Sequence, residues 1–334
     1  MMTRRKFLNC VTLTGAANVL GHARSSNAAE PAPETKRIRL SKVPSACVAP
    51  QYVAKELLRA EGFDQVEYVS AGAGGLPMAQ ALGRGQFDIG MNFAAPLVVA
   101  LDEGMPIVLL AGVHVGCFEL FTSERIRTFS DLKGKTAAIL SERSSQHIFL
   151  ASIATTIGLD PNRDIRWASH PASEAKQLLA EGKIDAFLGF PPDSQELRAK
   201  KIGRVLLNSA IDRPWSQYFC CPIAANHEFA RKHPIATKRA VRAILKASEL
   251  CASDPKLGAS AFLAHGFETN PEYALQAIRE QSYGKWRDYN PEETVRFYAL
   301  RLREAGMVRD APQKLIAQGT DWRILNELKR ELKA

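Results

Sequence analysis

Gly62-Phe63-Asp64 and Gly158-Leu159-Asp160 open two stretches of this chain that follow the same order of predicted elements. In each stretch a predicted strand comes next, then a helix, then a Leu-x-x-Gly-x-x-Asp run. The runs are Leu82-x-x-Gly85-x-x-Asp88 and Leu179-x-x-Gly182-x-x-Asp185, so each anchor recurs 97 residues later. Any α/β chain can produce helix, glycine and strand in this order. The fixed spacing nevertheless favours two similar α/β lobes, in which the two aspartates share a role in the fold.

Strand-like and helical runs alternate on both sides of the repeat. Predicted strands lie at 37–41, 65–69, 87–91, 107–113, 136–140, 165–169, 186–189 and 203–207. Predicted helices lie between them at 51–60, 76–82, 96–102, 145–157, 173–180 and 193–200. This alternation predicts mainly parallel sheets with crossover helices. After about residue 210, one strand-like run at 218–223 precedes a series of helices, several of which begin with a proline suited to a first helical turn.

The N-terminus has the pattern of an export signal. Thr3-Arg4-Arg5-Lys6-Phe7-Leu8 is followed by a mild apolar run to Leu20 and by small residues at Ser26-Asn27-Ala28. This order predicts a twin-arginine signal peptide at residues 1–28 and a periplasmic protein. A membrane span needs ~20 apolar residues, and this run is too short and too often interrupted, so no stable membrane insertion is expected. Residues 29–36 are predicted to form a linker.

Charge and cysteine content exclude several functions. Removal of the signal takes away four basic residues and no acids, which lowers the net charge from +9 to +5. Because the remaining basic residues are scattered among acids, nucleic-acid binding is not expected.

Five cysteines remain without a C-x-x-C spacing, and they are Cys47, Cys117, Cys220, Cys221 and Cys251. Cys220 and Cys221 are adjacent in a predicted strand, so one of them should face the core. No metal site is expected.

Several local motifs resemble one protein family. They are Gly85-Gln86-Phe87-Asp88-Ile89, the connection Leu101 to Ile107, Asp131-Leu132-Lys133-Gly134-Lys135, and Ser144-Ser145 at a helix start. With these motifs the chain resembles the substrate-binding proteins of ABC importers over roughly residues 37 to 330. It is most similar to the branch that carries sulfonates, taurine, nitrate and pyrimidine precursors, which also contains the fungal thiamine-pyrimidine synthases.

The resemblance implies an α/β type II periplasmic binding-protein fold, with two βα lobes joined by a two-strand hinge. Lobe one would comprise residues 37–122 plus 211–334, with the C-terminal helices packing on it, and lobe two residues 123–210. The crossovers would lie near Phe121–Ser123 and Ser209–Pro214 and would act as a hinge.

Candidate ligand contacts follow from strand order. In open α/β sheets, ligands bind beyond the carboxyl ends of the strands. The residues predicted to line the cleft are Pro44, Ser45, Gly72, Ala73, Gly74, Gly75, Asn92, Phe93, His114, Ser144, Ser145, Gln146, Phe190 and Trp215.

Each candidate also has a structural interpretation. Ser144-Ser145 at a helix start could bind an anion, or Ser144 could be only an N-cap. The Gly72–Gly75 loop lacks the later acid of a dinucleotide fingerprint, so we expect close backbone approach to a small ligand. Asn92 suits a polar contact with the ligand, or it could be a turn residue. Phe93 suits an apolar wall, or it could be a core residue.

His114 and His147 could bind an anion, although a structural place in a polar loop is favoured for both. Trp215, Tyr218 and Phe190 could form an aromatic wall or pack the hinge.

The sequence shows no Ser-His-Asp order, H-E-x-x-H motif or paired metal ligands. We therefore expect no enzyme activity and no cofactor. The chain is predicted to be a monomeric extracytoplasmic solute-binding protein. It would deliver a small organic anion or related heterocycle to the permease and ATPase subunits of an ABC importer.

One alternative is an enzyme on the same fold, of pyrimidine-precursor or menaquinone-pathway type. The cysteine-rich stretch typical of the eukaryotic pyrimidine enzymes is absent, with only Cys220-Cys221 here. Another alternative is a ligand-sensing subunit.

Overall fold

The computed structural model describes residues 30–72, 74–268 and 270–332. All the elements discussed below belong to one compact unit, Ala32–Ala334. The predicted signal peptide and Ala73 lie outside the described residues. Within the described part of the chain, no helix combines the length and the apolar character that crossing a membrane requires.

Ten strands form two five-stranded mixed sheets. The first sheet has the order β2-β1-β3-β10-β4 and the second has the order β7-β6-β8-β5-β9. The strands of the first sheet are β1 (Arg37–Ser41), β2 (Gln65–Val69), β3 (Ile89–Met91), β4 (Ile107–Val115) and β10 (Phe219–Asn226). Those of the second are β5 (Glu119–Thr122), β6 (Lys135–Ile139), β7 (Ile165–Ser169), β8 (Ala186–Gly189) and β9 (Arg204–Asn208).

Each sheet contains one strand that runs antiparallel to its neighbours. β10 pairs antiparallel with β3 and β4, and β5 pairs antiparallel with β8 and β9. The chain thus passes between the sheets twice, from β4 to β5 and from β9 to β10. The two crossovers are hydrogen-bonded to each other, because Ser209 Oγ accepts from the backbone of Cys117 at 3.1 Å and of Phe118 at 2.9 Å. The predicted two-sheet α/β fold is confirmed, whereas the lobe boundaries and the hinge motion stay predictions.

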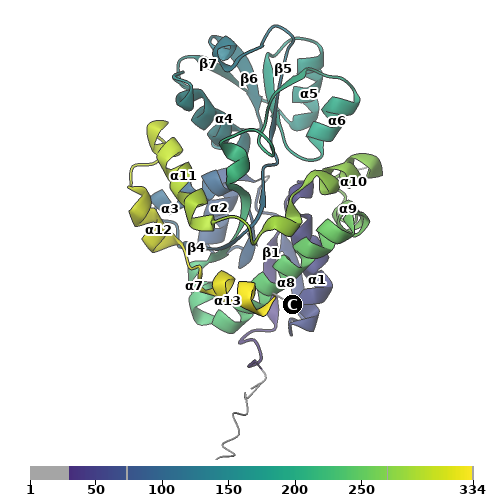
Figure 1. Ribbon diagram of the computed structural model, residues 1–334, viewed down its shortest axis with the longest axis vertical. Coiled ribbons are helices and arrows are strands. Elements are labelled where there is room, and N and C mark those ends of the chain that lie inside the picture. Colours follow the sequence, from purple (N-terminus) through teal and green to yellow (C-terminus); the bar gives the residue numbers. More distant parts are fainter. Residues whose placement is uncertain (1–29, 73, 269, 333–334) are drawn as a thin grey trace, which may run out of the picture. The chain divides into compact units, whose positions relative to one another are not determined.

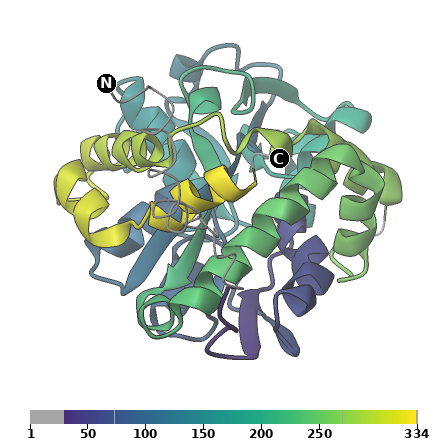
Figure 2. The same cartoon turned by 60° about the horizontal axis from the view of Figure 1, so that its bottom comes forward.

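Thirteen α-helices are described. Those that follow strands of the two sheets are α1 (Ala49–Ala60), α2 (Gly75–Gly83), α3 (Ala94–Asp102), α4 (Ser145–Thr156), α5 (Ala172–Ala180) and α6 (Asp193–Ala199). The C-terminal series is α7 (His227–Lys232), α8 (Pro234–Ser253), α9 (Pro255–Leu263), α10 (Pro271–Glu280), α11 (Pro291–Glu304), α12 (Pro312–Gly319) and α13 (Arg323–Glu331). Figure 1 draws α4, α5 and α6 around β5, β6 and β7. The long helix α8 lies beside α1 (Figure 2), so the C-terminal series returns to the first sheet.

The repeated aspartates have the same structural role in both sheets. Asp88 Oδ2 accepts from the backbone N–H of Arg39 at 2.8 Å, and Asp185 Oδ2 accepts from that of Thr136 at 3.0 Å. Arg39 and Thr136 are also 97 residues apart, and they lie on β1 and β6. The predicted shared role in the fold is therefore confirmed, since each aspartate anchors the strand that neighbours its own.

The cysteine pair departs from the expectation of one core side chain. Cys220 and Cys221 are each only 3% exposed. β10 lies between two strands inside the sheet, and all eight of its residues are buried. A strand covered on both faces buries both members of an adjacent pair.

Candidate functional site

Loops of the two sheets meet at the carboxyl ends of β1 and β8. The carbonyl of Pro191, after β8, accepts from the Ala46 backbone at 3.0 Å and from Ser45 Oγ at 3.2 Å. Nearby, the Leu76 backbone at the start of α2 donates to the Arg143 carbonyl at 3.2 Å. These hydrogen bonds join elements of the first sheet to elements of the second around one buried cavity.

The cavity is small and has walls from both sheets. Its lining residues are Val43, Ser45, Cys47, Val48, Gly74, Met91, Asn92, Phe93, Cys117, Phe118, Ser145, Gln146, Phe190 and Cys221. Its volume is about 40 Å³. That volume admits water, which needs roughly 10–15 Å³, but sites for organic ligands are usually about 300–1,000 Å³. In this structure the cavity is therefore too small to hold an organic solute.

Half of the predicted cleft residues line this cavity, namely Ser45, Gly74, Asn92, Phe93, Ser145, Gln146 and Phe190. The others lie elsewhere. Pro44 and Gly72 are in the adjoining loops, while Gly75 and Ser144 form backbone contacts beside the cavity. Trp215 packs beside Phe149 of α4, with ring centroids 6.3 Å apart, and does not line the cavity. Sequence reasoning missed Cys47, Cys117 and Cys221, because no local spacing connects them.

The N-terminus of α4 reaches the cavity edge. Ser144 is the N-cap, and its side chain accepts from the His147 backbone at 3.3 Å, so its structural interpretation is supported. Gly75 packs directly against this turn, with a φ of +74°, and a Cβ there would lie 2.8 Å from Ser145 N. Only glycine fits such an approach. The half-buried Ser145 therefore lies where two loops and a helix start converge.

Asn92 is held by its own neighbours. Its Nδ2 donates to the Gly75 carbonyl at 3.3 Å, and its Oδ1 accepts from the Phe93 backbone at 2.8 Å. The amide thus fixes the loop before α3 and has limited capacity for a solute. Asn92 therefore stabilises the turn before α3, which was one of its two predicted roles. It also lines the cavity.

Aromatic rings form one side of the cavity and connect the two sheets. Phe118, in the first crossover, lies 4.8 Å from Phe93 and 5.2 Å from Phe149 of α4, measured between ring centroids. Phe190 lies 6.3 Å from Phe118. Of the described residues that line the cavity, none is a lysine or an arginine. Positive potential at the wall comes from helix N-termini, because α1, α2, α3 and α4 all begin at residues that line the cavity or adjoin it.

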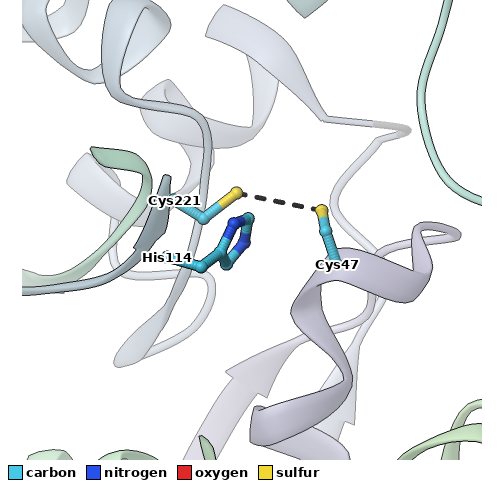
Figure 3. Close-up of side chains that lie close together, drawn as sticks. All are labelled: Cys47, His114 and Cys221. Atoms are coloured by element: carbon cyan, nitrogen blue, oxygen red, sulfur yellow. Dashed lines mark hydrogen bonds between the residues drawn. The ribbon is translucent and has the colours of Figure 1, made fainter. Parts of the chain in front are cut away.

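Three side chains with metal-binding capacity come together beneath this wall. Cys47 of the short 3-10 helix Ala46–Val48, His114 of β4 and Cys221 of β10 are all buried, and their ligand atoms lie within 4.8 Å of one another. Figure 3 shows the two sulfurs facing each other, 3.9 Å apart, with the imidazole ring beside them. The sequence predicted that His114 lies in the loop after a strand. The structure places it inside β4 instead. β-bulges around Cys221 shift the register of β10 at this point.

Burial and the neighbouring thiols shift the pKa of His114 in opposite directions. Burial lowers the pKa of His114, but the neighbouring Cys221 and Cys47 raise it more, to about 10. A hydrogen bond with Cys117 lowers the pKa of Cys221. A second group of thiols adjoins the first, since Cys117 Sγ lies 2.8 Å from Cys220 Sγ. All five described cysteines are free thiols.

Two polar contacts bridge the sheets outside the cavity. Glu103, after α3, pairs with Arg143, before α4. Glu280 of α10 accepts from Gln195 of α6 at 2.7 Å and also pairs with Arg198. The first pair borders a groove of about 460 Å³ that also includes His147. His147 therefore lies outside the buried cavity.

The family model described as "NMT1-like family" matches residues 31–263, which is more than half of the chain. The chain belongs to the NMT1-like family. A 4-amino-5-hydroxymethyl-2-methylpyrimidine phosphate synthase of Saccharomyces cerevisiae is 26% identical to this NMT1-like protein over 193 residues, covering 53% of this chain and 55% of the yeast protein. The chain thus spans about half the length of the curated relatives that it matches.

Solved structures show the same fold at low identity. The periplasmic nitrate-binding protein NrtA from Synechocystis PCC 6803 has a TM-score of 0.76 and 14% identity, covering 91% of the NMT1-like chain and 90% of its own. The alkanesulfonate-binding protein SsuA from Xanthomonas axonopodis pv. citri, bound to MOPS, has a TM-score of 0.67 and 19% identity, covering 88% and 100%. The predicted periplasmic binding-protein fold is therefore confirmed.

Proposed function

We propose that this NMT1-like protein is an extracytoplasmic solute-binding protein of an ABC importer. The observation that carries the proposal is a small cavity whose walls come from both sheets, next to two crossovers that are hydrogen-bonded to each other. A solute held there would contact both halves, and closure around it would present the loaded form to the permease and ATPase subunits. The protein would act as a monomer.

The walls favour an organic solute with little charge. Phe93, Phe118 and Phe190 offer apolar and aromatic contact, and Ser145 and Gln146 offer hydrogen bonds. The N-termini of α2, α3 and α4 border the cavity, and each stabilises a negative charge by only ~0.3–2 kcal/mol. A small organic anion with one charge, such as a sulfonate or carboxylate, or a polar heterocycle, fits this wall better than a multiply charged ion does.

Export by the twin-arginine route to the periplasm belongs to the same proposal. It rests on Arg4 and Arg5 and on the apolar and small residues that follow them. Replacement of both arginines by lysine should retain a full-length precursor in the cytoplasm. Normal amounts of processed protein in the periplasm would remove this part of the proposal.

A thermal-shift screen of small anions and heterocycles tests the binding function. A solute at 100 times its Kd adds ~2.7 kcal/mol to the free energy of unfolding, which raises Tm by about 4 °C at an unfolding entropy of ~2.1 cal/mol/K per residue. We expect at least one compound to produce such a rise. If no anion or heterocycle stabilises the reduced, mature protein, the proposed solute class is wrong.

An enzyme is the second candidate, because the curated yeast relatives are named as synthases. The two candidates differ in the fate of the solute. Mass spectrometry after incubation with the best-stabilising compound should recover that compound unchanged. A new product, formed once or repeatedly per chain, would favour the enzyme.

A further inference from the structure

We propose that Cys47, His114 and Cys221 bind a thiophilic metal ion of the Zn²⁺ or Cu⁺ type, with an open coordination position toward the cavity between the sheets. The proposal is independent of the transport function, because metal binding is measured by itself. It concerns three residues that no motif spacing in the chain connects.

The distance between the two sulfurs matches a shared metal. Two metal–sulfur bonds of about 2.3 Å at a tetrahedral angle place the sulfurs roughly 3.8 Å apart. Cys47 Sγ and Cys221 Sγ are 3.9 Å apart. The third ligand atom of the group lies within 4.8 Å of both. Small side-chain rotations would therefore bring all three ligands to bonding distance of one ion.

His114 supplies an independent observation. The side chain is 1% exposed, and its Nε2 has no hydrogen-bond partner among the described residues. Its Nδ1 lies 3.4 Å from the Val115 carbonyl, as an N–H donor would. Coordination through Nε2 requires that this nitrogen be deprotonated, so metal binding would displace any proton that it carries. A buried polar atom without a partner costs stability, and a metal bond would satisfy it.

The ligand types select the metal. Two thiolates and one imidazole suit Zn²⁺ or Cu⁺ and are a poor set for Mg²⁺ or Ca²⁺, which prefer oxygen. Cys47 and Cys221 are part of the cavity wall, whereas His114 lies behind it. Three protein ligands leave one tetrahedral position for water or solute. A donor atom of a solute in the cavity could occupy that position.

Cobalt and zinc titrations of the reduced protein test the site. Wild-type protein should bind one Co²⁺ with sulfur-to-cobalt absorption in the near ultraviolet, and Zn²⁺ should displace it. Because loss of a supporting residue alone costs about 10–100-fold in affinity, Cys47→Ser and Cys221→Ser should each weaken Zn²⁺ binding by at least about 100-fold. A parallel titration with Cu⁺ shows which ion the site prefers.

Cys251→Ser is the matched control, since Cys251 is also a fully buried thiol but lies on α8. It should bind Zn²⁺ like the wild type. The wild-type cobalt spectrum requires no variant, so misfolding of a variant cannot hide the answer. Absence of sulfur-to-cobalt absorption together with absence of stoichiometric Zn²⁺ or Cu⁺ binding would overturn the proposal. Equal Zn²⁺ affinity in wild type, Cys47→Ser and Cys221→Ser would overturn it as well.

Discussion

Glu119 is a buried carboxyl group beside the first crossover between the sheets. It lies on β5 just after the first crossover, and its side chain is only 7% exposed, 3.6 Å from Arg198. Burial raises the pKa of Glu119 to about 7, against the smaller opposing effect of Arg198. The folded protein therefore holds this proton more tightly than the unfolded chain does.

The pH dependence of stability follows from that difference. Glu119 contributes stability that is present below its unfolded pKa of 4.5 and is lost as pH rises to about 7. Between these values, the free energy of unfolding of the wild type should fall relative to Glu119→Gln by on the order of 3 kcal/mol. Urea unfolding of both proteins across this pH range measures it. Parallel curves would show that Glu119 does not titrate in this way.

Glu103→Gln provides a comparison of opposite sign. Burial raises the pKa of Glu103, but hydrogen bonds from Arg143 and Gln80 lower it more. Its contribution to stability is therefore present at neutral pH and lost as pH falls through its folded pKa. A Glu103→Gln variant should be destabilised relative to wild type at neutral pH, and this difference should shrink in acid.

At the scale of elements, the contact between the starts of α2 and α4 decides whether the cavity can close. Gly75 has a φ of +74°, and an added Cβ would approach Ser145 N to 2.8 Å and Ser144 Cα to 2.9 Å. Both are backbone atoms, so no side-chain rotation can relieve the clash. Any larger residue at position 75 must push the two helix starts apart.

Gly75→Ala should therefore weaken solute binding by at least about tenfold, a cost of ~1.4 kcal/mol. Gly182→Ala is the control, because Gly182 has a φ of +68° and nothing within 4 Å of an added Cβ. Both variants should lose ~1–2 kcal/mol of stability from alanine in the left-handed region. Calorimetry should detect weaker binding in Gly75→Ala alone. Equal affinities in the two variants would mean that this contact is not part of the closed state.

Local sequence signals predicted the repeated elements well, because each has its own turn and alternation. β2 and β7 were predicted with the observed bounds. β5 overlaps the predicted crossover strand near Phe121–Ser123, but its bounds and its place in the second sheet were not predicted, since four residues without polar alternation carry little periodic signal. The prediction that the chain crosses between sheets near Ser209 matches the connection from β9 to β10.

Long-range pairing limited the prediction of the site. Residues that directly follow strands, such as Asn92 and Phe190, were found because strand ends are visible in sequence. Cys47 follows β1, His114 is on β4 and Cys221 is on β10, and only the strand order β1-β3-β10-β4 brings the three together. Bulges in β10 further decide where Cys221 points. Neither the strand order nor a bulge has a local signature that one sequence reveals.

For the whole molecule, energetics require both halves to hold the solute. Micromolar capture needs about 8 kcal/mol, whereas the α4 N-terminus supplies ~0.3–2 kcal/mol. The balance must come from the aromatic wall, from hydrogen bonds and from exclusion of water. Since the closed cavity is only about 40 Å³, opening and closing of the two halves would have to accompany binding.

The central claim is that a solute binds between the two sheets, at the start of α4. Isothermal titration of the best-stabilising anion into wild type, Ser145→Asp and Ser173→Asp tests it most directly. Ser173 is the control, because it is exposed in the first turn of α5, away from the cavity. An aspartate in a first turn does not destabilise a helix, so both variants should melt like the wild type without solute. We expect Ser145→Asp to bind at least about tenfold more weakly and Ser173→Asp to bind normally. Wild-type affinity in Ser145→Asp would contradict the account.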